Sequence, residues 1–163
     1  MWGKILSLIL VSFLLGWTTN IIMEEAVAQP IIEAPDVVQN SLEKPSPYDW
    51  VDERDITVGP NSVTFKIDDP EWSTFTNTNS MDPVIDEGVH AIQKRPKSES
   101  DIHVGDIVSY IPENYNGVVI HRVVEIGDDG AWYAYVKGDN NPYRDPQKVR
   151  FAQIQRVLVA IIY

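Results

Sequence analysis

The stretch DIVSYI at residues 106–111, followed by VVIHRVVEI at 118–126 and AWYAYVK at 131–137, decides the fold. All three runs are short and rich in β-branched and aromatic residues, a composition typical of β-strands. Clusters of Gly, Pro, Asn and Asp separate them at 112–117 and 127–130, where they mark turns. The three runs therefore predict consecutive strands joined by short connections.

The same pattern extends to both sides of this stretch. Three further β-rich runs lie at residues 62–67, 89–93 and 154–163. In the first of them, apolar and polar residues alternate with the period of two that a strand requires. Helix signals are poor throughout this part of the chain. Residues 61–163 are therefore predicted to form a mainly β domain, a small folded-over antiparallel sheet or barrel.

The N-terminus contains a long uncharged segment. Ile5 to Met23 covers about 19 residues, which would span roughly 28 Å as a helix, close to the hydrocarbon thickness of a bilayer. Lys4 precedes the segment and Glu24–Glu25 follows it, so the positive-inside rule places the remaining chain outside the cytoplasm. We expect residues 1–23 to be one transmembrane anchor. The alternative is a signal peptide cleaved after the AVA at 26–28.

Residues 24–60 are predicted to be an extracytoplasmic tether. Prolines interrupt any regular element there, among them Pro30, Pro35, Pro45 and Pro47. The segment is either a spacer that holds the domain away from the membrane or a loosely packed extension of it. In the second case, Tyr48 and Trp50 are candidates to dock on the domain.

Composition excludes several classes of function. The chain has 13 Lys and Arg against 24 Asp and Glu, a formal net charge of −11, which argues against nucleic-acid binding. Cysteine is absent, which excludes disulfides, thiol catalysis and Cys-ligated zinc. The three histidines show no HxxxH or HExxH spacing, so we expect neither a metal nor another cofactor.

Ser80, His121 and Asp145 occur in an order that can supply a nucleophile, a base and an acid. A serine attacks an amide only when a base removes its proton, and histidine does this near neutral pH. A carboxylate behind the imidazole holds its tautomer and stabilises the imidazolium. Spacing alone leaves a second interpretation open, in which Ser80 and Asp145 form turns and His121 is a half-buried strand residue.

Four sequence boxes strengthen the catalytic interpretation. They are NSMDP at 79–83, GDIV at 105–108, IHRVV at 120–124 and KGDNN at 137–141. In this order they closely resemble the boxes of type I signal peptidases, above all the archaeal and endoplasmic-reticulum branch, in which histidine stands where bacterial enzymes have lysine. The resemblance covers roughly residues 75–163.

The resemblance implies specific roles for the residues in these boxes. Ser80 would be the nucleophile, His121 the general base and Asp145 the third catalytic residue, while Asp139 would order the site. Thr78 would donate to the oxyanion beside the backbone N–H of Ser80; alternatively, it only caps the turn. Asn79 departs from the glycine usual in relatives, but asparagine tolerates the left-handed conformation well. The chain also lacks any long insertion between the boxes.

The sequence thus predicts a membrane-bound serine endopeptidase that removes signal peptides from exported preproteins. Its implied partners are those preproteins, membrane lipid and a protein translocation channel. The alternatives are a peptidase for a narrow set of surface precursors and a catalytically inactive relative that acts as an anchored binding domain.

Overall fold

The computed structural model describes residues 43–163, and Lys44–Tyr163 form one compact unit. The predicted anchor at 1–23, the alternative cleavage site at 26–28 and most of the tether lie outside the described residues. The compact unit begins inside the segment predicted as tether. Within residues 43–163, no helix has the length and apolar character needed to cross a bilayer.

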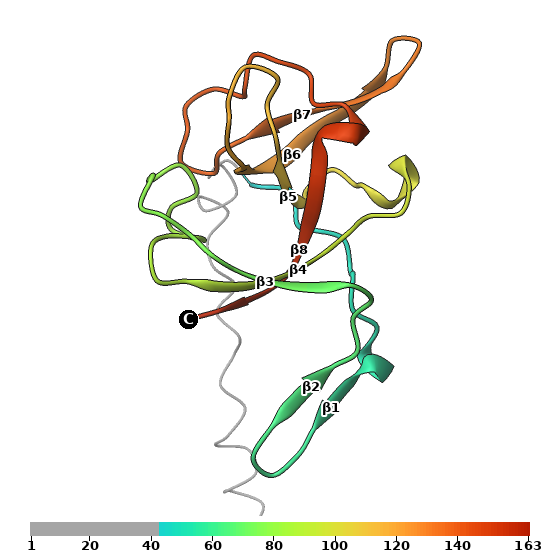
Figure 1. Cartoon of the computed structure of the whole chain (residues 1–163), viewed down its shortest axis with the longest axis vertical. Helices are drawn as coiled ribbons and strands as arrows, with labels where there is room; N and C mark the ends of the chain where they lie inside the picture. The colour runs from blue at the N-terminus through green and yellow to red at the C-terminus, as the bar shows by residue number, and fades with distance from the viewer. Residues whose placement is uncertain (1–42) are drawn as a thin grey trace, which may run out of the picture. The chain divides into compact units, whose positions relative to one another are not determined.

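A six-stranded antiparallel sheet dominates the unit (Figure 1), which confirms the prediction of a mainly β, antiparallel domain. Its strands are β3 (Pro70–Thr74), β4 (His90–Lys94), β5 (Ile107–Tyr110), β6 (Val119–Asp128), β7 (Trp132–Lys137) and β8 (Ile154–Ile162). The spatial order is β3-β4-β8-β5-β6-β7, so the C-terminal strand lies between β4 and β5. Single-turn 3₁₀ helices occur at Glu53–Asp55, Glu99–Asp101 and Phe151–Gln153.

A separate hairpin precedes this sheet. It consists of β1 (Ile56–Val58) and β2 (Val63–Phe65), and Figure 1 shows it extending away from the six-stranded sheet. The predicted run at 62–67 corresponds to β2, whereas β1 and β3 were not predicted. β1 has only three residues, and β3 begins with Pro70, which lacks an N–H and is tolerated here because β3 is an edge strand.

Each face of the six-stranded sheet packs a different hydrophobic core. The cluster on one face comprises Ile102, Val108, Tyr110, Val123, Ala134, Val136, Val149, Ile154 and Val157. The cluster on the other comprises Met81, Ile85, Ala91, Ile107 and Leu158. Consecutive residues of a strand point to opposite faces, so β5 supplies Ile107 to one core and Val108 to the other. Both faces of β5 are covered, which explains why all four of its residues are buried.

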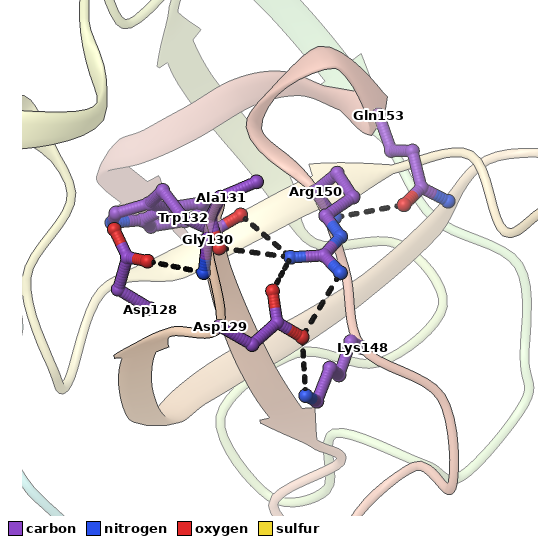
Figure 2. Close-up of polar contacts among 8 residues, drawn as sticks. All are labelled: Asp128, Asp129, Gly130, Ala131, Trp132, Lys148, Arg150 and Gln153. Carbon is purple, nitrogen blue, oxygen red and sulfur yellow. Dashed lines mark hydrogen bonds and ion pairs between the residues drawn. The ribbon is translucent and has the colours of Figure 1, made fainter.

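The turn between β6 and β7 is tied to the segment before β8 (Figure 2). Asp128 accepts a hydrogen bond from the backbone of Gly130, which has a left-handed φ of 99°. The carboxylate of Asp129 pairs with Lys148 at 2.6 Å and with Arg150 at 2.8 Å. These cations hold the pKa of Asp129 well below its ordinary value. The cluster is partly exposed to solvent and has its charges paired internally, so it fastens the hairpin end.

The segment that enters the domain packs directly on the sheet, and we name residues 45–50 the strap. The fully buried Asp106 accepts hydrogen bonds from the backbone N–H of Tyr48 at 2.9 Å and from Trp50 Nε1 at 3.0 Å. A Cβ at Gly105 would lie 2.0 Å from the carbonyl oxygen of Ser46, so only glycine fits beneath the strap. Tyr48 and Trp50 therefore dock on the domain, as the second interpretation of the tether predicted.

Candidate active site

Ser80 lies at the start of a turn whose backbone requires an unusual residue. Asn79 has a φ of 54°, in the left-handed region that asparagine tolerates better than most residues. The turn thus forms without a glycine at position 79. Thr78 Oγ1 lies 3.1 Å from Ser80 Oγ, so the two hydroxyls share a hydrogen bond. Both side chains line the cavity described below.

The end of β7 holds the Ser80 turn in place. Asn140 donates from its backbone to Ser80 O at 2.9 Å and from its side chain to Asn79 O at 2.9 Å. A Cβ at Gly138 would lie 2.5 Å from Ser80 O, so this close approach requires glycine. Lys137, the residue before Gly138, pairs with Arg122 of β6. The turn therefore lies against the end of β7, next to the Arg122–Lys137 pair of the ladder.

His121 and Asp145 form the pair that the sequence predicted. His121 Nδ1 lies 2.8 Å from Asp145 Oδ2, and the backbone N–H of Asp145 donates to Val136 O at 2.8 Å. His121 is buried, and Asp145 is half-buried in the loop after β7. A carboxylate on Nδ1 keeps the proton on that nitrogen and leaves Nε2 as the basic one.

Tyr110 on β5 is a third member of this group that sequence reasoning did not assign to the site. Its hydroxyl donates to Asp145 Oδ2, the same oxygen that His121 contacts. Burial and the adjacent carboxylate raise the pKa of Tyr110 well above its ordinary value, so the phenol stays protonated as a donor. The registers Tyr110↔Val119 and Val108↔His121 bring tyrosine and histidine together, and no local motif records that pairing.

The charge of Asp145 is stabilised despite its partial burial. Burial raises the pKa of Asp145, but the hydrogen bonds from His121 and Tyr110 outweigh this effect and hold the pKa below its ordinary value. Asp145 is therefore an anion at neutral pH, as orientation of an imidazole requires.

Asp139 lies on the opposite face of β6, away from His121. Its carboxylate receives two bonds from Arg122, Nε to Oδ1 at 2.8 Å and Nη2 to Oδ2 at 2.7 Å. Arg122 also donates to the carbonyl oxygens of Pro45 and Gly105. The backbone N–H of Asp139 contacts Met81 Sδ at 3.4 Å. Asp139 therefore supports the segment that follows Ser80 and does not touch the His121–Asp145 pair.

A cavity of about 670 Å³ opens beside Ser80. Its walls come from the segment before Ser80, from the start of β6, and from β3, β4, β5 and β8. The residues nearest in sequence to the predicted site are Thr76, Thr78, Ser80, Met81, Val118, Val119 and Ile120. Such a groove, with the Ser80 hydroxyl on its wall, can accommodate an extended peptide.

The predicted site residues thus form two groups, and no hydrogen bond joins one group to the other within residues 43–163. One group joins Thr78 to Ser80, and the other joins His121, Asp145 and Tyr110. Within residues 43–163, no hydrogen bond connects Ser80 Oγ with the His121 ring. Contacts between catalytic groups are often long before substrate binds, and they tighten in the complex.

Comparisons with protein-family models, curated proteins and solved structures give no match to this chain. The geometry of the site and the four sequence boxes are therefore the features that bear on function.

Proposed function

We propose that this chain is a membrane-bound serine endopeptidase that cleaves exported preproteins after a small residue. The observation that carries the proposal is the His121–Asp145 pair, oriented by a 2.8 Å contact, in a domain whose Ser80 lies on the wall of a peptide-sized cavity. The resemblance of the four boxes to type I signal peptidases supplies the substrate class.

In the proposed reaction, Ser80 Oγ attacks the scissile carbonyl carbon while His121 Nε2 takes the hydroxyl proton. The backbone N–H of Ser80 and the hydroxyl of Thr78 would stabilise the oxyanion. His121 then gives the proton to the leaving amine, and an acyl-enzyme remains. Water, activated by the same imidazole, hydrolyses this ester and restores Ser80. Asp145 keeps the imidazole oriented through both steps.

Membrane attachment belongs to the same proposal. The uncharged segment from Ile5 to Met23 would anchor the chain, with the catalytic domain outside the cytoplasm. Substrates that are themselves held in the membrane would then meet the site at high effective concentration. A translocation channel is the implied neighbour.

The deciding experiment is cleavage of a preprotein with an Ala-x-Ala site by the full chain in detergent micelles. Wild type should release the mature product and Ser80→Ala should not. The matched control is Asn77→Ala, a truncation in the exposed segment before the turn, and it should retain activity. Equal product from wild type and Ser80→Ala would refute the assignment of the nucleophile.

A second candidate function is peptide binding without cleavage. It is favoured by the lack of a hydrogen bond between Ser80 and His121 within the described residues. A fluorophosphonate probe distinguishes the two functions, because it phosphonylates only an activated serine. Labelling that disappears in both Ser80→Ala and His121→Ala supports the peptidase, whereas unlabelled wild type that binds preprotein supports the binding domain.

A further inference from the structure

The face of the sheet that lines the cavity changes from apolar to polar along two strands. On β4, Ala91 and Gln93 point to the same side, and on β5 the same holds for Ile107 and Ser109, because side chains alternate along a strand. Ala91 and Ile107 belong to the apolar core that also contains Met81, the residue after the nucleophile. Gln93 and Ser109 lie one side-chain repeat further along.

Gln93 and Ser109 form a continuous polar row with Ser73 of β3. Ser109 Oγ donates to Gln93 Oε1 at 2.8 Å, and Gln93 Nε2 donates to Ser73 Oγ at 2.9 Å. β8 separates β4 from β5, so the Gln93 side chain reaches across that strand to meet Ser109. Gln93 is 4% exposed and Ser109 5%, yet all three residues line the cavity beside Ser80.

This row has hydrogen-bonding capacity that its internal contacts do not use. A glutamine amide offers two donors and two acceptor positions, and the contacts to Ser109 and Ser73 use one of each. Ser73 accepts from Gln93, which leaves its own hydroxyl proton available. An apolar ligand in this part of the cavity would remove these groups from water without replacing the bonds, which is unfavourable.

We propose that the Ser73–Gln93–Ser109 row is a substrate subsite that selects a hydroxyl side chain, serine or threonine, at the third residue before the scissile bond. In an extended peptide, side chains two residues apart lie on one side at about 6.6 to 6.8 Å spacing, the same repeat that separates Ala91 from Gln93. The residue at the scissile bond would contact the apolar row near Met81, and the third residue before it would reach the polar row.

The inference rests on the proposed peptidase function for the position of the scissile bond, but peptide binding tests it separately. The probes are four fluorescent ten-residue peptides with Ala at the scissile position and Ser, Thr, Ala or Val at the third residue before it. Fluorescence anisotropy with full-length Ser80→Ala protein in micelles gives Kd without cleavage. We expect the Ser and Thr peptides to bind about tenfold more tightly than the Ala and Val peptides.

Two variants in the Ser80→Ala background locate the source of this preference. Ser73→Ala removes the available donor from a half-buried position of the edge strand, and Gln93→Met replaces the amide with an apolar chain of similar length. Both should reduce the preference to about twofold or less. Thr74→Ala is the matched control, since Thr74 lines the same cavity from the same strand without belonging to the row. A thermal melt establishes that each variant is folded.

Equal affinity for the four peptides, no binding of any of them, or a preference that both variants retain would overturn the inference. If Gln93→Met does not fold, Ser73→Ala alone decides between these outcomes. Failure of the peptidase proposal looks different: wild type would bind the Ser peptide preferentially and cleave none. Cleavage of all four peptides with equal kcat/KM would leave the peptidase standing and refute the subsite.

Discussion

Two neighbouring residues of β6, His121 and Arg122, each hold a carboxylate from the segment after β7, yet the two pairs are built differently. Arg122 and Asp139 share two bonds, and their side chains are 7% and 3% exposed. His121 and Asp145 share one contact, and the Asp145 side chain is 23% exposed. Strand alternation places the pairs on opposite faces of the sheet.

The difference is consistent with a structural role for the Arg122–Asp139 pair and the proposed catalytic role for the His121–Asp145 pair. Arginine stays charged at any pH that a folded protein meets, so its pair with Asp139 is permanent and suits a structural role. An imidazole can take up and release a proton during a reaction, so the His121–Asp145 pair is compatible with the proposed role of a general base. One face of β6 thus holds Asp139 through Arg122, and the other face carries the imidazole that Asp145 orients.

The sharpest way to break the comparison is to remove the imidazole. His121→Ala should lower kcat/KM for preprotein cleavage by about 10³-fold or more, because the general base and its orientation are both lost. The free energy of unfolding, measured in urea, should change far less than it does for a variant of Arg122. Retention of activity within about tenfold of wild type would remove His121 from the mechanism.

Removing the Arg122 guanidinium should affect stability more than activity, the reverse of what is expected for His121→Ala. Arg122→Met leaves Asp139 buried without a counter-charge, which should lower the free energy of unfolding by about 3 to 5 kcal/mol. Arg144→Met breaks the exposed pair with Glu125 and should cost less than about 1 kcal/mol. Urea denaturation of both variants provides the measurement. Similar losses of unfolding free energy in the two variants would mean that the buried Arg122–Asp139 pair stabilises the fold no more than the exposed Arg144–Glu125 pair.

A substitution at Gly138 tests how strongly the position of Ser80 depends on the end of β7. Gly138→Ala places a Cβ against Ser80 O, which should cost about 1 to 3 kcal/mol of stability and reduce the rate of acylation. Gly59→Ala, where a new Cβ meets nothing closer than 3.4 Å, is the control and should change neither property. If a fluorophosphonate labels Gly138→Ala as fully as it labels wild type, the reactivity of Ser80 tolerates displacement of its turn.

The smallest expected effect concerns acid stability. The pKa of Asp145 is lower in the folded state than in the unfolded chain, so its stabilising contribution is present above about pH 4 and is lost as the pH falls. Tyr110→Phe removes one of the bonds that lower this pKa, so the loss should begin at higher pH, with a cost of about 1 kcal/mol at pH 7.

Urea unfolding between pH 7 and pH 3 measures that shift. The control is Tyr110→Phe in an Asp145→Asn background, where removal of the hydroxyl should no longer alter the pH dependence. A shift of the same size in that background would assign the effect to packing of Tyr110 in the core and not to its bond with the carboxylate.

The sequence was informative wherever the signal was local. The β-branched run at 118–126 predicted β6, and asparagine at position 79 is compatible with a left-handed turn, which its φ of 54° confirms. β3 was not predicted because Pro70 and Trp72 lie on an exposed edge strand, with no buried side to create an alternating pattern.

The candidate site was predictable only where a motif names its residues. The contact between His121 and Asp145 was predicted from a family resemblance, whereas the bond from Tyr110 was not. Gln93 and Ser109 also meet only because the C-terminal strand enters between β4 and β5. Pairings of that kind depend on sheet order and register, which short-range patterns do not encode.

The strap at residues 45–50 determines where a soluble fragment of this protein can begin. Asp106 has no solvent contact, and two of the three groups that donate to its carboxylate come from Tyr48 and Trp50. A fragment that starts at residue 51 would bury a carboxylate without those donors and uncover Gly105. A fragment that starts at Glu43 keeps them. For recombinant production, the usable domain boundary therefore lies before the prolines at 45 and 47, well before the first strand.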